Sequence, residues 1–89
     1  MTTVVEIDGF LETNGRREPF YARISAPTAM GRTREYSCLV HAPRLFKKDK
    51  QISGIDAAQA KELAVQFLKS MLDGKLLVDK NGKPIDLDN

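Results

Sequence analysis

Residues 5–24 read VEIDGFLETNGRREPFYARI and contain, near their middle, the dipeptide Asn14-Gly15. These two residues accept the left-handed backbone conformations that a two-residue type I′ hairpin turn requires. Pairing the flanking residues across that turn places Glu12 opposite Arg17, so that opposite charges face each other. The sequence therefore predicts an antiparallel hairpin with strands over residues 3–13 and 16–26.

The same register sorts the remaining side chains of the hairpin onto two faces. The pairs on one face are Glu6 with Arg23 and Asp8 with Tyr21, whereas those on the other are Val5 with Ile24, Ile7 with Ala22, and Gly9 covered by Phe20. A slip of one residue would exchange the two faces, so the pattern favours this register. Pro19 has no N–H group, which indicates an unpaired position or a bulge in the second strand.

The middle of the chain alternates loops with one further strand. Residues 27–33 read as a connecting loop, and residues 34–42 as a third strand that ends before Pro43. The third strand places Tyr36, Cys38 and Val40 on one face and Ser37, Leu39 and His41 on the other. Residues 43–55 mix basic and apolar side chains without periodicity and are expected to form a long connection, of the kind that is often functional.

An amphipathic helix is predicted over residues 57–73. Asp56 is a good N-cap, Gln59 completes a capping box, and Ile55 is placed for a hydrophobic staple with Ala60. Gly74 is expected to stop the helix. The apolar stripe recurs at three- and four-residue spacing and consists of Ala60, Leu63, Ala64, Phe67, Leu68, Met71 and Leu72.

These elements predict a single α+β domain spanning residues 1–89. Its architecture is a three-stranded antiparallel meander packed by one amphipathic helix and followed by a short C-terminal β-hairpin or edge strand, in the order β-β-β-α-β-β. The tail of this scheme comprises residues 76–78, a turn over residues 79–82, and residues 83–87. Truncation of Leu63 or Phe67 to alanine is expected to cost about 2–5 kcal/mol, because both belong to the apolar stripe.

Composition narrows the classes of function. The chain has 89 residues, of which 42% are apolar and 29% charged, as in an ordinary globular protein. Met1 to Glu6 lack the features of a signal peptide, and no apolar run approaches the length of a membrane span, so we expect a cytoplasmic protein without membrane association. A domain of this size has little room for an enclosed substrate cavity in addition to its core.

The residue types of common catalytic and metal sites occur without the necessary arrangement. Cys38 is the one cysteine and His41 the one histidine, and three residues apart on a strand they project to opposite faces. Glu6, Asp8 and Glu12 share a strand face and could chelate a cation, but the arginines opposite them offer a simpler pairing. We therefore predict no catalytic residue, metal ligand or cofactor.

Two binding classes remain open. Nine Lys or Arg residues lie in positions 16–50 against three acidic ones, so this region could meet nucleic acid. Tyr and Arg are also favoured in protein interfaces, which makes a protein partner or a second copy of the chain the preferred expectation. The candidate interaction surface consists of Phe10, Tyr21, Arg23, Leu39 and His41 on the outer sheet face, with Arg44, Phe46, Lys47 and Lys48 from the long loop. Phe46, with Leu45, is expected to tuck under the helix.

A segment near the helix start resembles a known group of proteins. Gly54-Ile55-Asp56-Ala57-Ala58-Gln59-Ala60, preceded by a cysteine-bearing strand and a long loop, resembles a small bacterial family of unknown function over roughly residues 36–73. The resemblance implies a bacterial cytosolic sheet protein with one main helix. It implies no catalytic residue, because none is assigned in that family.

Overall fold

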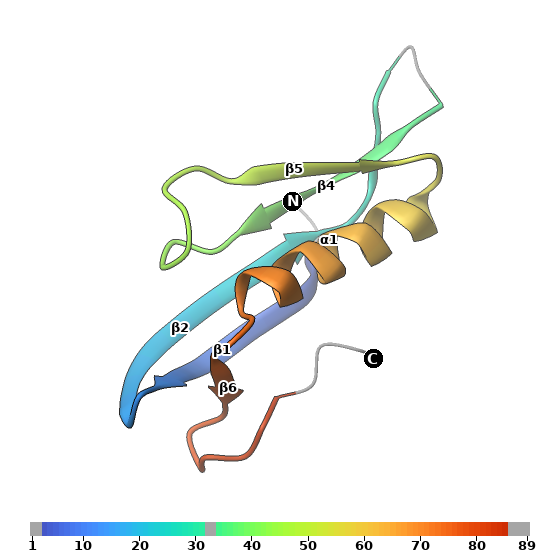
Figure 1. The fold of residues 1–89 in the computed structure, drawn as a ribbon. Helices are drawn as coiled ribbons and strands as arrows, with labels where there is room; N and C mark the ends of the chain where they lie inside the picture. The colour runs from blue at the N-terminus through green and yellow to red at the C-terminus, as the bar shows by residue number, and fades with distance from the viewer. Residues whose placement is uncertain (1–2, 32–33, 86–89) are drawn as a thin grey trace.

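The computed structural model describes residues 3–31 and 34–85, which form one helix and a six-stranded, mostly antiparallel sheet (Figure 1). The α+β class expected from the sequence is confirmed, although the sheet contains more strands than the predicted meander. In chain order the elements are β1 (Thr3–Thr13), β2 (Arg16–Ser25), β3 (Thr28–Ala29), β4 (Tyr36–His41), β5 (Lys50–Gly54), α1 (Ala57–Met71) and β6 (Leu76–Val78).

The β1–β2 hairpin forms in the predicted register. Asn14 and Gly15 have φ angles of 52° and 79°, the left-handed values that a type I′ turn demands. Glu12 pairs with Arg17, and the pairing continues without a slip as far as Val5, where an irregularity separates it from Thr3. The hairpin thus presents one aliphatic and one polar face, as expected.

Pro19 sits where its missing N–H causes no loss. In an antiparallel ladder the residues alternate between pairs that exchange hydrogen bonds and pairs that do not. Counting from the turn-closing pair, Thr13 with Arg16, the pair of Phe10 with Pro19 does not exchange them. The backbone of Pro19 therefore points away from β1, towards the side of β2 on which β4 lies. Strand β4 does not pair with this part of β2, so no hydrogen bond is lost and the strand needs no bulge there.

Strand β4 pairs with three other strands, and two of these lie where the sequence predicted loops. It pairs with β2 through two residue pairs, with β3 through two more, and on its other side with β5 along five positions. Both β3 and β5 lie in segments that the sequence presents as loops, residues 27–33 and 43–55. Residues 32 and 33 of the first segment lie outside the described part of the chain.

Helix α1 begins as predicted and ends slightly early. The Gln59 amide donates to Asp56 Oδ1 at 2.7 Å, and Gln59 Oε1 accepts from the Ile55 amide at 2.8 Å, which satisfies two backbone donors at the helix start. The predicted hydrophobic staple is wrong, because the Ile55 side chain is 71% exposed while Ala60 is fully buried. Regular helix ends at Met71, three residues before Gly74 with its φ of 80°.

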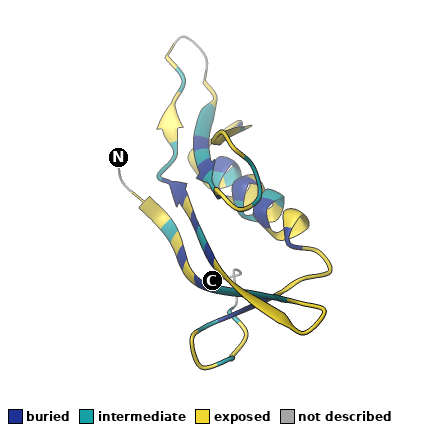
Figure 2. Cartoon of the chain, turned by 90° about the vertical axis from the view of Figure 1, so that its left-hand side faces the viewer, coloured by how far each residue is buried: buried dark blue, intermediate teal, exposed yellow. Residues whose placement is uncertain are grey.

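The core lies between α1 and the inner face of the sheet (Figure 2). The helix buries a narrower stripe of apolar residues than predicted, because it packs over β4 and β5 and contacts β2 at only a few positions. Leu63 and Met71 are 38% and 37% exposed, so both lie at the margin of the core. The buried positions of the helix and the turn after it are Ala60, Ala64, Leu68 and Leu72.

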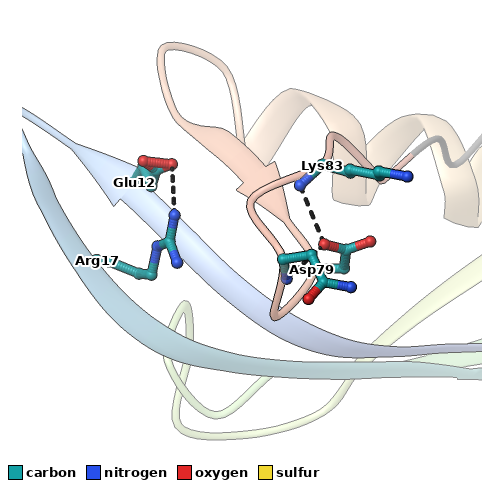
Figure 3. A network of polar contacts seen from close by, with 5 residues as sticks. Glu12, Arg17, Asp79 and Lys83 are labelled. Carbon is teal, nitrogen blue, oxygen red and sulfur yellow. Dashed lines mark hydrogen bonds and ion pairs between the residues drawn. The ribbon is translucent and has the colours of Figure 1, made fainter.

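The C-terminal segment extends part of the other edge of the sheet, as expected for an edge strand. Strand β6 pairs antiparallel with β1 at Phe10–Glu12, and a turn leads back to a bridge between Val78 and Pro84. Asp79 accepts backbone hydrogen bonds within this turn, near the Glu12–Arg17 pair (Figure 3). Asp86 and Leu87, the end of the predicted arm, lie outside the described residues.

Candidate interaction surface

The outer sheet face is built from alternate residues of three neighbouring strands. Helix α1 packs on the opposite face of the sheet, so the outer face has no helix over it. The predicted residues on the outer face are Phe10, Tyr21, Arg23, Leu39 and His41, of which Arg23 is exposed and the other four are partly exposed. The register of β1 with β2 and of β2 with β4 brings these residues together, since Arg23 is directly opposite His41.

Tyr21 is held by two neighbouring side chains. Its hydroxyl donates to Glu6 Oε2 at 3.0 Å, and its ring meets the His41 ring edge-on with the centroids 6.2 Å apart. The hydrogen bond to the Glu6 carboxylate raises the pKa of Tyr21, and partial burial acts in the same direction. The predicted register is confirmed, because Glu6 is opposite Arg23 on the neighbouring strand. The Glu6 carboxylate in addition accepts the hydrogen bond from Tyr21.

His41 is held from its other side by Asp49. The Nδ1 atom of His41 lies 2.7 Å from Asp49 Oδ1, and the two side chains are 33% and 41% exposed. A carboxylate that orients an imidazole is one part of a nucleophilic catalytic site. The candidate thiol, Cys38, however, is fully buried in the core on the other face of β4. The pair fixes the imidazole ring beside Tyr21.

Polar contacts extend the surface towards β5. Gln51 Nε2 donates to Ser37 Oγ at 3.2 Å and approaches Met30 Sδ at 3.9 Å, and Ser53 Oγ lies 3.5 Å from the same sulfur. Met30 therefore covers the far end of the outer face. At the opposite end the Arg17 guanidinium lies 5.9 Å from the centre of the Phe10 ring and 3.5 Å from Glu12.

The loop residues that the sequence grouped with this surface go to different places. Arg44 lies along the free part of β2, where it donates to the Pro19 carbonyl at 3.2 Å and pairs with Glu18 at 3.6 Å. Phe46 packs on Phe67, which confirms that it tucks under the helix. Lys47 and Lys48 are exposed on the loop itself.

Some residues of the surface carry no signal in the sequence. Asp49, Met30 and Gln51 all lie in segments predicted as loops, so their contacts with the sheet could be found only once β3 and β5 were known. Alternation along a strand is the signal that does work. It places Tyr21, Arg23 and His41 on one face, whatever the path of the loops.

Two hollows lie near this surface. One of about 230 Å³ touches Tyr21 and is bounded by Asp8 and Pro43, and another of about 390 Å³ lies by the hairpin end, next to Arg44. Within residues 3–31 and 34–85, no three His, Cys, Asp or Glu side chains lie close enough to hold a metal ion. None of the helical segments that the structure describes is long and apolar enough to cross a membrane.

No family model, no curated protein and no solved structure matches this chain.

Proposed function

We propose that this chain is a non-catalytic protein-interaction module whose contact surface is the outer sheet face. The observation that carries the proposal is the cluster of Tyr21, His41 and Arg23, which lies on the side of the sheet opposite the helix. Tyrosine and arginine supply much of the binding energy in protein interfaces when they are rigidly held. Here the hydrogen bond to Glu6 and the contact with Asp49 hold the two rings before any partner arrives.

Preorganisation is the physical advantage of this arrangement. Ordering a free side chain on binding costs about 0.5–1.5 kcal/mol, and a side chain already fixed avoids that cost. Leu39 adds a half-buried apolar surface on the next strand, and its amide is anchored to Ser25 Oγ at 2.8 Å. The surface thus joins Leu39 to Tyr21 and Arg23, and Tyr and Arg are residue types enriched in protein interfaces.

The test is site-specific photo-crosslinking in the source cells. A photoreactive residue at Leu39 should capture one defined protein, and the product should disappear when Arg23→Glu is added. The matched control places the same residue at Ala58, which is exposed on the helix. Identical products from both positions, or a product unaffected by Arg23→Glu, would overturn the proposal.

Nucleic-acid binding is the second candidate, and the exposed Lys47 and Lys48 on the β4–β5 loop favour it. It is the weaker candidate, because Arg17 and Arg44 from the basic region are already paired with carboxylates. Fluorescence anisotropy with labelled single strands at low salt tests it. Binding that weakens with salt, with a slope reduced in Lys47→Glu/Lys48→Glu, would support it.

A further inference from the structure

Among the residues that the structure describes, strand β5 pairs only with β4, which leaves its other edge open. The Leu39 amide donates to Ser25 Oγ, so the backbone of Leu39 faces β2 and β3. By the alternation of an antiparallel ladder, Val40, Cys38 and Tyr36 then exchange hydrogen bonds with β5. The backbone groups of Gln51 and Ser53 consequently point outward from the sheet. The next outward amide, that of Ile55, is already bonded to Gln59 Oε1.

This edge is complementary to itself. When a second β5 approaches antiparallel about a two-fold axis at Ile52, Gln51 of each copy falls opposite Ser53 of the other. Both residues direct their N–H and C=O groups outward, so the pair of strands forms four N–H···O bonds. From this geometry we infer that a second copy of the chain binds at β5 and continues the sheet across the axis, a mode of association known as β-strand addition. The inference concerns a surface other than the one proposed above.

The helix above the edge supplies apolar contact at the same axis. Gly54, at one end of β5, lies against the backbone of Ala60. At the other end the Nζ atom of Lys50 lies 5.8 Å from the centre of the Phe46 ring, and that ring packs on Phe67. The four residue steps from Lys50 to Gly54 in β5 and the seven from Ala60 to Phe67 in α1 cover similar lengths, about 13 Å and about 11 Å. Leu63, midway along α1 and 38% exposed, therefore sits near Ile52 and close to its own copy.

The charges also favour association at β5 over association at the part of β1 that β6 does not pair with. The outward backbone groups of β1 beyond β6 belong to Val4, Glu6 and Asp8, as the ladder with β2 implies. A two-fold axis at Glu6 would place two carboxylates opposite each other, which is destabilising. At β5 the axis falls on Ile52, and Lys50 is opposite Gly54 of the other copy. The two lysines are then about 13 Å apart, beyond the screening length of about 8 Å at physiological salt.

The experiment measures molecular mass by sedimentation velocity and light scattering between about 10 μM and about 1 mM, a range that covers weak association. The wild type should form dimers as concentration rises. Ser53→Pro removes one outward N–H from each copy and should weaken association at least tenfold. Ser53→Ala loses the hydroxyl contact with Met30 but keeps that N–H, so it should dimerise like the wild type. A chain that stays monomeric throughout, or Ser53→Pro dimers as stable as wild type, would overturn the inference.

A second pair of variants covers the case in which proline disturbs the fold, which circular dichroism would reveal. Leu63→Lys, on the flank of α1 above β5, should weaken the dimer, whereas Ala58→Lys on an exposed face should not. Hydrogen exchange at the Gln51 and Ser53 amides should slow as concentration rises. Arg23→Glu should leave dimerisation unchanged, so a failed dimer and a failed outer-face partner give separate results.

Discussion

Two glycines stand where any side chain would collide with backbone. A Cβ atom on Gly54 would lie 2.5 Å from the Ala60 amide nitrogen, and one on Gly9 would meet the Val78 carbonyl and the end of Ile85. These are close approaches of one element to another, so the glycines set how near α1 and the C-terminal segment come to the sheet. Pairing Gly9 with Phe20 was predicted. The contact of Gly9 with the C-terminal segment was not predicted, because that contact depends on the path of β6.

Gly54→Ala should destabilise the protein by about 1–3 kcal/mol, the usual cost of overpacking a tight site. The added methyl group meets helix backbone, which cannot rotate away as a side chain would. The measurement is urea-induced unfolding followed by circular dichroism. Ser53→Ala, one position earlier on the same strand, is the control and should cost much less. Equal stability of Gly54→Ala and wild type would contradict the close approach.

Asp79 should make part of the stability depend on pH. The Lys83 and Asn81 amides donate to its carboxylate at 3.0 and 2.8 Å, and these bonds, the one from Lys83 above all, lower the pKa of Asp79. A carboxyl group whose pKa is lower in the folded state stabilises the fold above its unfolded pKa. That contribution is lost as the pH falls through the folded pKa.

Asp79→Asn is the variant that isolates this effect, because it keeps an acceptor oxygen but cannot ionise. The wild type should be the more stable of the two at about pH 7, and the difference should shrink as the pH falls through about 4 towards about 2. Urea unfolding at each pH measures it. A difference that is the same at both ends of this range would show that the charge of Asp79 contributes nothing.

At the scale of elements, the helix shows which apolar residues carry the core. Leu68 is fully buried whereas Leu63 is 38% exposed, although both belong to the predicted stripe. Leu68→Ala should therefore cost about 2–5 kcal/mol, and Leu63→Ala less than about 1 kcal/mol. Thermal and urea unfolding of the two variants compare them directly. Equal losses would mean that the helix is rotated relative to the sheet, with Leu63 turned inward.

The elements predicted well are those whose signals are local. The Asn14-Gly15 turn, the alternation of the hairpin and the Asp56 cap each lie within a few residues, so β1, β2 and the start of α1 could be located from sequence. Strand β5 could not be located, because Lys50 to Gly54 contains a single apolar side chain, Ile52, and includes Lys and Gly, which are depleted in strands. Its strand structure comes from pairing with β4, and that pairing leaves no mark within the segment itself.

The residues of the candidate surface could also be predicted only where the sequence signal is local. Its strand residues could be placed on one face from alternation alone, which needs no knowledge of distant contacts. The loop residues could not be placed, because Arg44 turns to the free edge of β2 and Phe46 packs inward on Phe67. The partner of His41, Asp49, became visible only when the path of the β4–β5 connection was known.

For the molecule as a whole, Cys38 reports on opening of the core. The side chain is fully buried, and this burial raises the pKa of its thiol, so the reactive thiolate is scarce in the native state. We expect labelling by an aromatic disulfide reagent to require unfolding. Leu68→Ala should then raise the labelling rate about tenfold for each 1.4 kcal/mol of stability that it removes. A labelling rate indifferent to Leu68→Ala would point to a local opening around β4.

The short pairing between β2 and β4 has a consequence for the rate at which the chain folds. Two residue pairs, Arg23 with His41 and Ile24 with Val40, join the β1–β2 hairpin to the unit formed by β4, β5 and α1. Each of these parts is assembled from neighbours in sequence and closes short loops, which is fast. We therefore expect the rate-limiting collision to be the meeting of Ile24 with Val40, so that trimming either side chain slows refolding more than it accelerates unfolding.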